Sequence, residues 1–370
     1  MKAENLRKIV ELRHELHAHP ELSMHESWTK RRLMDFIAEN TTLSVVDCGA
    51  WFYAARYREG SRAVAFRADM DALPIPESIK LPWGSKIPGV SHKCGHDGHS
   101  AALCGAALEL EGADCPRSLY FIFQHAEETG QGGAVAAAML KERGVTEVYA
   151  CHNWSGYPQG CIMLRRGLCE CASRGLTVRM TGRRSHASEP ENGNNPVFAL
   201  AELALEVRRL LAAPHQGMIL ATIVNLSVGT RDFGVSPGEG EISMTLRADR
   251  EAEMDALEAK IRGRAMELAM AAGLEVGFDT ADAFPETVSD GECVDRVEAA
   301  AKRLGFPVVP LDAPWRGSED FGHYTKQCPG AIFYVGNGED WPAIHTLEYD
   351  YNDKVLETAA DLFCGIYRGE

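Results

Sequence analysis

The sequence predicts a mixed α/β protein in which a smaller α+β domain is inserted into a larger α/β domain. Two patterns support this fold class. In the outer parts of the chain, short β-branched and aromatic runs such as "AVAFRAD" (63–69) alternate with helical patterns. From about 172 to 284 the apolar residues instead alternate strictly, and the order becomes strand, helix, strand, strand, helix, strand. That βαββαβ order is typical of a ferredoxin-like domain.

The strands of the larger domain are predicted from apolar runs without alternation, as expected for strands that are buried on both faces of a sheet. These strands are 63–69, 118–128, 147–153 and 331–337. Apolar residues at helical spacing predict the surrounding helices, and glycine or proline closes most of them. The predicted helices are 2–18, 26–40, 97–111, 131–143, 290–304 and 353–367.

The inserted domain is expected to span 172–284, with hinges near 170–174 and 284–289, which leaves 1–171 and 285–370 for the larger domain. Its predicted strands are 175–182, 218–228, 241–248 and 274–280, and its predicted helices are 195–213 and 251–272. The strand "MILATIVNLSV" (218–228) would lie at an exposed sheet edge. Because unpaired edges seek partners, we expect a homodimer through this domain.

The composition of the chain argues against several classes of function. The 370 residues are 45% hydrophobic and 25% charged, which is ordinary for a folded protein, and no segment approaches the roughly 18 apolar residues of a membrane helix. A net charge of −15 argues against nucleic-acid binding. The chain begins with a charged helical pattern rather than an apolar signal segment, and its eleven cysteines are scattered, several in apolar runs. We therefore expect reduced thiols and a cytoplasmic location.

Polar clusters follow the predicted strands of the larger domain, at the edge where the carboxyl ends of strands bind ligands. They are "RADMD" (67–71), "HAEE" (125–128), "CHN" (151–153) and "AIHT" (343–346), together with the loop "SHKCGHDGHS" (91–100). Imidazole, thiolate and carboxylate together suit zinc or a similar ion, and two acceptor-rich subsites suit a two-metal hydrolytic site.

Glu127 and Glu128 present a particular problem, because adjacent carboxylates at a buried strand end repel each other. A metal ion would supply the missing positive charge. Adjacent strand residues point to opposite sides, so one carboxylate can bind metal while the other serves as a general base. The alternative is a solvated acidic strand end without a function.

The chain resembles the aminoacylase/carboxypeptidase superfamily of co-catalytic metallopeptidases, and in particular its amidohydrolase branch of indole-acetyl-amino-acid hydrolases, hippurate hydrolases and N-acyl-amino-acid deacylases. The motifs that carry the resemblance are, in order, "LRHELHAHPELS", "FRADMDALPI", "KCGHDGHSAAL", "QHAEETGQGG", "CHNWSGYPQG", "TGRRSHAS", "GSEDFGHY" and "IHTLEYDYND". The resemblance implies a catalytic domain of zinc-peptidase type that hydrolyses the amide bond of small N-acyl amino acids or related conjugates.

Carried over by motif, the resemblance implies two divalent ions. Thiolate favours zinc, while manganese, cobalt and nickel stay open. The implied metal ligands are Cys94, which would bridge the ions, His96, Glu128, His152 and His345. Glu127 matches the general base that activates water, and Asp69 resembles the carboxylate that orients ligands. His186 matches a histidine that reaches the partner's active site in related dimers and steadies the oxyanion.

One departure from the branch concerns substrate contacts. The branch usually carries an Asn-Val-Ile-Pro stretch whose asparagine touches the substrate, whereas this chain has "DFGVSPG", with Gly234 at that place. Nearby Arg231 or Asn225 could compensate. Arg247 in "TLRAD" matches an arginine that could pair with a substrate carboxylate.

Other polar residues of the motifs have structural interpretations. Hydrogen-bonding or structural roles are expected for His92, His99 and His125, and Asp97 is expected to cap the helix that follows it. Glu319 and Asp320 match a family motif near the site, where a supporting role is expected.

Three alternatives stay open. A dipeptidase or carboxypeptidase could use the same site. A cysteine hydrolase using Cys94 with His96 or His99 would survive chelators and lose activity on thiol alkylation. A non-catalytic binding protein on the same fold would have lost ligands, whereas this chain keeps all of them.

Overall fold

The computed structural model describes residues 1–58, 62–114 and 117–369. The chain divides into two compact units, of which the first contains Met1–Cys169, Thr287–Pro314 and Glu319–Glu370 and the second contains Glu170–Glu286 and Trp315–Ser318. The short segment Trp315–Ser318 lies within the predicted larger domain but groups with the inserted unit. It does so because Glu170 pairs with Trp315 and the Cys171 N–H donates to the Gly317 carbonyl.

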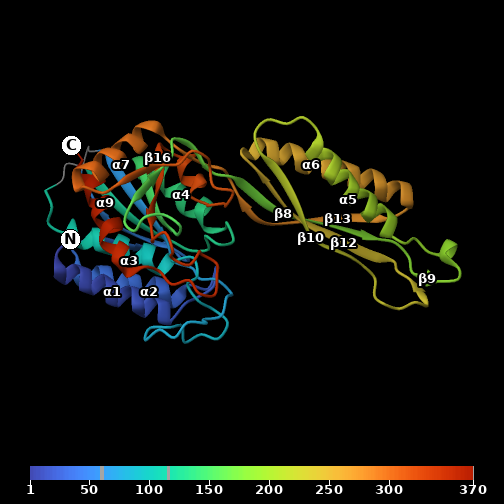
Figure 1. The fold of residues 1–370 in the computed structure, drawn as a ribbon, viewed down its shortest axis with the longest axis horizontal. Helices are drawn as coiled ribbons and strands as arrows, with labels where there is room; N and C mark the ends of the chain where they lie inside the picture. Colours follow the sequence, from blue (N-terminus) through green and yellow to red (C-terminus); the bar gives the residue numbers. More distant parts are fainter. Residues whose placement is uncertain (59–61, 115–116, 370) are drawn as a thin grey trace. The chain divides into compact units, whose positions relative to one another are not determined.

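The first unit is built on an eight-stranded sheet in the order β1-β2-β4-β3-β5-β16-β6-β15 (Figure 1). Strands β4, β3, β5 and β16 run parallel to one another, so their carboxyl ends share one edge. The strand bounds are β1 (Ser44–Asp47), β2 (Phe52–Arg56), β3 (Ala63–Asp69), β4 (Ser118–Gln124), β5 (Val145–Trp154), β6 (Ile162–Leu164), β15 (Val308–Pro310) and β16 (Gly330–Gly336). A separate two-stranded sheet pairs β7 (Gly167–Glu170) with β14 (Thr287–Ser289).

Helices cover both faces of this sheet. They are α1 (Ala3–Ala18), α2 (Ser27–Asn40), α3 (His96–Glu109), α4 (Gly132–Glu142), α7 (Gly291–Leu304), α8 (Gly322–Thr325) and α9 (Leu356–Arg368), with the short 3-10 helix η2 (Asp353–Val355) before α9. One core contains α1, α2, α3, α7 and α9 and every second residue of β4, namely Leu119, Phe121 and Phe123. Helix α4 contacts β4 and β5 and supplies no residue to that core, which places it on the opposite face.

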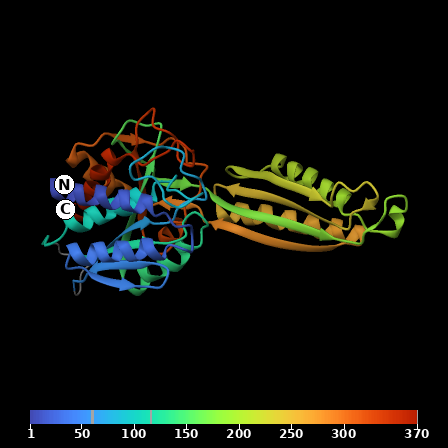
Figure 2. The same cartoon turned by 90° about the horizontal axis from the view of Figure 1, so that it is seen from below.

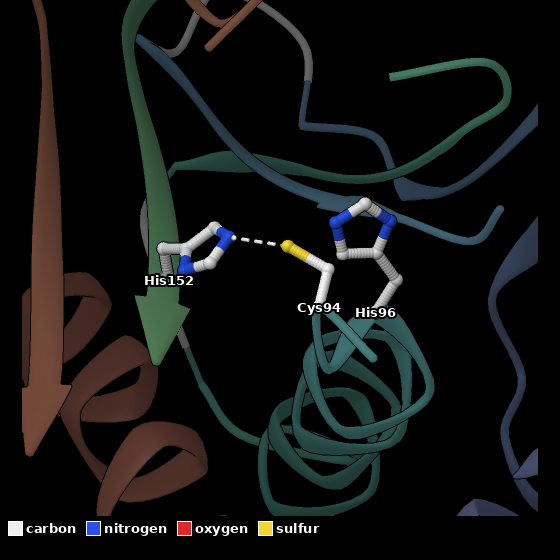
Figure 3. A group of neighbouring side chains, drawn as sticks. All are labelled: Cys94, His96 and His152. Carbon is white, nitrogen blue, oxygen red and sulfur yellow. Dashed lines mark hydrogen bonds between the residues drawn. The ribbon is translucent and has the colours of Figure 1, made fainter. Parts of the chain in front are cut away.

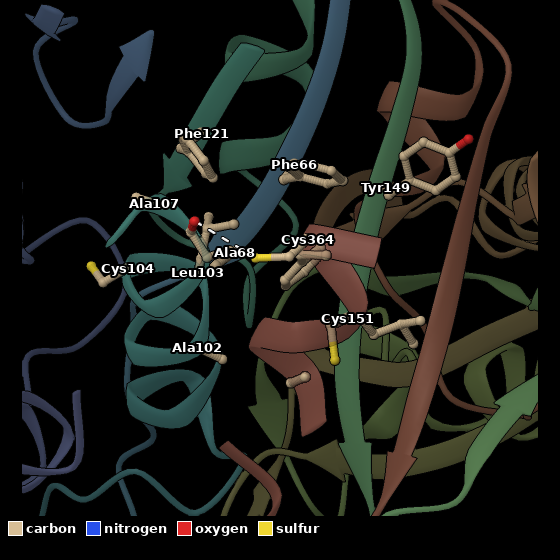
Figure 4. Packing of buried hydrophobic residues seen from close by; sticks show 14 of the residues in the cluster. Phe66, Ala68, Ala102, Leu103, Cys104, Ala107, Phe121, Tyr149, Cys151 and Cys364 are labelled. Atoms are coloured by element: carbon tan, nitrogen blue, oxygen red, sulfur yellow. Dashed lines mark hydrogen bonds between the residues drawn. The ribbon is translucent and has the colours of Figure 1, made fainter. Parts of the chain in front are cut away.

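Helix α3, whose residues are all buried except Glu109, lies at the centre of this core. It packs against α9, and Figure 4 shows Leu103 of α3 and Cys364 of α9 beneath the aromatic residues of the sheet. The rings of Phe66 and Phe363 are 5.0 Å apart. Contacts with α1, α2 and α9 and with the strands of the sheet hold α3 in place. Its first turn, which carries His96 and Asp97, is therefore buried as well.

The inserted unit has the predicted βαββαβ order. Its elements are β8 (Ala172–Thr181), α5 (Val197–Ala212), β10 (Ile219–Val228), β12 (Glu239–Ala248), α6 (Glu251–Ala272) and β13 (Glu275–Phe284). The sheet order is β10-β12-β8-β13, and α5 and α6 lie side by side on one face of it (Figure 2). Beyond this sheet, β9 (Ser185–His186) pairs with β11 (Val235–Ser236), and η1 (Pro190–Asn192) follows β9. The ferredoxin-like prediction is confirmed, and β10 lies at the predicted edge.

The strands and helices that were predicted for the larger domain match the observed ones to within a few residues, with one instructive error. The predicted strand 118–128 is too long, because β4 ends at Gln124 and the chain then turns. Within the described residues, no helix is long and apolar enough to cross a membrane.

Candidate metal centre

The predicted ligands converge at the carboxyl edge of the parallel strands. Cys94 and His96 lie where the chain enters α3, His152 lies near the end of β5, and the turn after β4 carries Glu127 and Glu128. Figure 3 shows Cys94 and His96 at the start of α3, with His152 facing them from β5. The Cys94 Sγ atom lies 3.4 Å from His152 Nε2.

Gly95 makes the position of Cys94 and His96 possible. It has φ 100, in the left-handed region that favours glycine, and a Cβ atom there would lie 2.5 Å from Asn153 Nδ2 and 2.6 Å from Tyr349 Oη. Only glycine fits this close approach. The two flanking side chains are consequently held at fixed positions, and both are buried.

In each buried histidine of the site, one ring nitrogen contacts an oxygen atom of the protein. His152 Nδ1 donates to the carbonyl of Asn153 at 2.7 Å, so Nε2 keeps its lone pair. His96 Nδ1 lies 3.2 Å from Asp71 Oδ1, and His96 Nε2 is buried without a hydrogen-bond partner. This pattern, with one nitrogen oriented by the protein and the other facing the ligand group, is usual in metal-ligating histidines.

Glu127 and Glu128 are placed by a tight turn rather than by strand alternation, so that part of the sequence interpretation was wrong. Ala126 has φ 49, its N–H donates to Glu26 Oε1 at 2.7 Å, and its carbonyl accepts from the N–H of Gly132. The turn directs Glu127 Oε2 to 3.8 Å and Glu128 Oε1 to 3.7 Å from His96 Nε2.

His345 approaches from the segment before α9. Its Nε2 lies 3.7 Å from Glu128 Oε1, and its side chain is 50% exposed. The backbone of His345 is left-handed, with φ 63, and its N–H donates to the Lys93 carbonyl at 2.7 Å.

These side chains form two ligand groups that share one residue. Cys94, His96 and His152 form the first, Cys94, Glu128 and His345 form the second, and the ligand atoms within each lie within 4.8 Å of one another. His96 Nε2 and Glu128 Oε1 are both buried without a hydrogen-bond partner. Unpartnered buried polar atoms are costly, and a cation between them would remove that cost. The donor set therefore fits two metal ions, with Cys94 common to both groups.

The electrostatics also favour cations. Burial, Glu319 and Asp320 raise the pKa of Glu127, and burial, with Asp71, raises the pKa of Glu128 to about 7 against the opposing effect of His96. Burial, Glu128 and Glu127 raise the pKa of the Cys94 thiol. These groups become anionic at neutral pH when positive charge is placed among them.

Two aspartates of the "RADMD" motif support His96 differently. Asp69 Oδ1 accepts from His99 Nδ1 at 2.7 Å and lies 3.9 Å from His96 Nδ1. Asp71 makes the shorter contact with His96, at 3.2 Å, and also accepts from the Glu128 N–H at 3.0 Å. The sequence interpretation assigned no role to Asp71, although its place in the same strand-end motif was a usable signal.

The remaining motif residues are structural in this arrangement. His99 Nε2 accepts from the Asn153 N–H at 3.1 Å, as its expected hydrogen-bonding role requires. The cap predicted for Asp97 was wrong. Gly95 is the N-cap of α3, and Asp97 Oδ2 instead lies 3.0 Å from Arg13 Nε and 2.8 Å from His17 Nδ1. Arg13 is far away in the sequence, so no local pattern indicated this pair.

Glu319 and Asp320 surround the buried guanidinium of Arg67, at 3.0 Å and 2.7 Å. The Asp320 N–H lies 3.4 Å from Glu127 Oε1. His92 and His125 are buried, and neither belongs to a ligand group in the part of the chain that the structure describes.

The predicted residues of the inserted unit are exposed or partly exposed. The exposed His186 accepts at Nδ1 from the Ser188 N–H at 3.1 Å, which leaves Nε2 as the donor of the neutral ring. His186 pairs with Val235, and the N–H of Ala187 donates to the carbonyl of Gly234; Arg231 precedes these residues in the same loop. Asn225, on the edge strand, donates to Glu241 Oε1 at 3.1 Å.

Arg247 lies apart from these residues within the inserted unit. It pairs with Ser173 at one end of β8, whereas Thr181 at the other end leads toward His186. Its Nη1 donates to the Arg316 carbonyl and to Ser318 Oγ, both at 2.9 Å. Within one chain, Arg247 and His186 are therefore not brought together by this unit.

Known proteins give a consistent picture. The model of the family described as peptidase family M20/M25/M40 matches residues 65–368. The chain is 28% identical over 365 residues to an N-acetylcysteine deacetylase of Bacillus subtilis (strain 168), covering 96% of this chain and 95% of the relative. It is 29% identical over 364 residues to a hippurate hydrolase of Campylobacter jejuni subsp. jejuni, covering 95% and 94%. A solved structure from Bacillus subtilis, a dinuclear metal binding peptidase from the M20 family, matches with a TM-score of 0.82, 26% identity and coverage of 99% and 98%.

Proposed function

The chain belongs to peptidase family M20/M25/M40, and we propose that this metal-dependent amidohydrolase cleaves the amide bond of small N-acyl amino acids. The family resemblance stated from the motifs is confirmed by this match. The observation that carries the proposal is the pair of ligand groups sharing Cys94, with the carboxylate of Glu127 beside them.

Two metal ions are the cofactors, and we assign them to Cys94, His96, Glu128, His152 and His345. When bound, the ions would polarise the substrate carbonyl and acidify a water molecule. We infer zinc because thiolate and imidazole donors suit it, with manganese, cobalt or nickel as the alternatives.

Glu127 is the proposed general base. It takes the proton of the attacking water and later returns it to the nitrogen of the leaving amine. Burial, together with Glu319 and Asp320, raises the pKa of Glu127, and bound cations would bring it down toward the range in which the carboxylate accepts a proton. The N–H of Asp320 faces Glu127 Oε1 and restricts its orientation. Asp69 and Asp71 hold the histidines, and each contacts a different one most closely.

His186 is the proposed oxyanion donor, supplied by a partner subunit. Its Nε2–H is available because Nδ1 is occupied by Ser188. Arg231, Asn225 and Arg247 are the proposed substrate contacts. A homodimer through the inserted unit is supported by the edge strand β10, on which Ile223, Val224 and Leu226 are exposed. The free thiols of the described cysteines support a cytoplasmic location.

The electrostatics speak against the thiol-hydrolase alternative, which would pair Cys94 with His96 or His99. Burial and two nearby carboxylates, those of Glu128 and Glu127, raise the pKa of the Cys94 thiol. A nucleophilic cysteine needs the opposite shift, because its thiolate attacks.

The test is a metal-reconstituted substrate screen. The full chain is stripped with chelator, reloaded with Zn²⁺, Mn²⁺, Co²⁺ or Ni²⁺, and assayed on acetyl-, benzoyl-, indoleacetyl- and aminobenzoyl-amino acids and on plain dipeptides. We expect N-acyl amino acids to be cleaved, with activity lost on stripping and restored by an ion. Activity that persists after the metal is removed and is lost on thiol alkylation would support the thiol hydrolase. Faster cleavage of dipeptides than of N-acyl amino acids would support a peptidase. No cleavage of any of these compounds would support a binding protein.

A further inference from the structure

Lys93 is a fully buried lysine for which the proposed mechanism has no use. It directly precedes Cys94 in the loop that enters α3. Its Nζ donates to Glu77 Oε1 at 2.7 Å and to the backbone carbonyl of Tyr349 at 2.8 Å. Its own carbonyl accepts from the His345 N–H at 2.7 Å. Lys93 thus binds the segment 345–349 at both ends, through its backbone at one and through its side chain at the other.

The segment 345–349 needs such support. His345 has a left-handed backbone, which is unfavourable for a residue other than glycine, and its half-exposed side chain has little packing to fix it. The other end of the segment is held at Tyr349, whose hydroxyl donates to Asn153 Oδ1, next to His152. Contacts at both ends therefore determine where the His345 imidazole lies.

The charge of Lys93 is matched by Glu77, which belongs to no ligand group in the described part of the chain. Glu77 also lies 2.8 Å from His17 Nε2, and His17 Nδ1 lies 2.8 Å from Asp97. Arg13 contacts Asp97 and Asp350, and so links the first turn of α3 to the same C-terminal segment. A buried ammonium is expensive unless it is paired and fully hydrogen-bonded, and a neutral side chain would fill the same volume without that cost. Packing alone therefore does not explain why a charged lysine occupies position 93.

We propose that Lys93 is a positioning residue that holds His345 beside Cys94 and Glu128 and thereby sets the metal affinity of that ligand group. The inference rests on the proposed two-metal site. The group formed by Cys94, His96 and His152 does not include His345, so Lys93 governs one ion and not the other.

The test is Lys93→Met, which keeps an unbranched side chain of similar length and removes the charge. Zn²⁺ affinity is measured on the full chain by competition with a chromogenic chelator, without substrate, so that the two sites are resolved. We expect the weaker site of the variant to lose about 10–100-fold in affinity, as when partners that orient ligands are removed, while the other site is unchanged. Hydrogen exchange of 345–349 should become faster, and activity lost at limiting Zn²⁺ should recover as Zn²⁺ is raised.

Lys30→Met is the matched control. Lys30 also bridges a carboxylate and a carbonyl, those of Asp47 and Gly49, but it joins α2 to the edge strand β1, away from the ligand groups. The Lys30→Met variant should bind zinc at both sites with the affinities of the wild type.

Unchanged affinity at both sites, or equal loss at both together with a lower melting temperature, would overturn the proposal. Should Lys93→Met fail to fold, Glu77→Gln removes the charge partner and keeps the Tyr349 bond, and the same selective loss, smaller in size, is expected. Normal two-site zinc binding without hydrolysis of any N-acyl amino acid would count against the proposed function alone.

Discussion

Apart from the half-exposed His345 and the partly exposed Arg247, the two units of this protein hold their predicted functional residues in opposite ways. In the first unit Cys94, His96 and His152 are 6%, 0% and 6% exposed, and the ring of each histidine is oriented by a named partner. In the inserted unit His186, Asn225 and Arg231 are exposed. Buried polar groups need partners from their own chain, whereas exposed ones are available to a substrate or to another subunit. One chain therefore completes the ligand groups, while the inserted unit offers residues to something outside it.

The largest effect is expected from Cys94→Ala, which removes the residue common to both ligand groups. Bound metal should fall from two ions to one or none by elemental analysis, and activity should fall by at least about 10³-fold, because the ions supply several kcal/mol of transition-state stabilisation. Cys104→Ala, a buried cysteine on α3 outside the ligand groups, is the control and should keep both ions. Cys94→Asp should keep part of the activity, since a carboxylate can also bridge metals; complete loss with both ions bound would point to a nucleophilic thiol.

The second largest effect is expected for an exposed residue of the inserted unit. His186→Ala should lower kcat by about 10²–10³-fold, as the loss of one oxyanion donor does, without changing the metal content. Heterodimers of His186→Ala and Glu127→Ala subunits, isolated with two tags, should regain about half of the wild-type activity per dimer, because each contains one complete site. No recovery in such heterodimers would remove the assignment of His186 to the partner's site.

A smaller effect is expected from Asp71→Asn. The substitution weakens the contact that orients His96, so Zn²⁺ affinity should fall by about 10–100-fold in a chelator competition. Asp47→Asn, at the surface, should leave the affinity unchanged. An Asp71→Asn protein with wild-type affinity would show that the buried partners of the first unit do not set its metal binding.

The smallest effect concerns stability and pH. Burial, with Asp71, raises the pKa of Glu26 from 4.5 to about 7. The fold thus favours protonated Glu26, and this contribution is complete below pH 4.5 and is lost as the pH rises through 7. The free energy of unfolding of the wild type relative to Glu26→Gln should therefore fall by about 1–3 kcal/mol between pH 5 and pH 8. Urea denaturation of both proteins in the same metal-loaded form measures this; a difference that does not vary with pH would contradict it.

Sequence periodicity predicted the elements in which burial follows a regular pattern along the chain. The strands around 63–69 and 331–337 and the βαββαβ order of the inserted unit were predicted correctly, because apolar runs and strict alternation are local signals. The short strands β1 and β2 were not predicted. Four or five residues carry too little pattern even where they are buried, as in β2, and the places of the two strands come from the pairing of β1 with β2 and of β2 with β4.

At the site, too, features that depend on the local sequence were predicted, and features that depend on distant residues were not. The motifs named side chains that the structure brings together, but the turn at Ala126, the contact between Asp97 and Arg13 and the bond between His345 and Lys93 were not predicted. Each depends on a partner distant in the sequence or on a left-handed backbone at a residue other than glycine. No periodicity or motif spacing reports such contacts.

The most direct test of the proposed reaction is Glu127→Gln. The variant keeps the size of the side chain and removes the base, so it should be folded, bind two metal ions, and hydrolyse N-acyl amino acids about 10²–10⁴-fold more slowly than the wild type. Metal content and the rate on the best substrate of the screen are measured on the same preparation. A folded, metal-loaded Glu127→Gln protein that hydrolyses its substrate as fast as the wild type would contradict the assignment of Glu127 as the base.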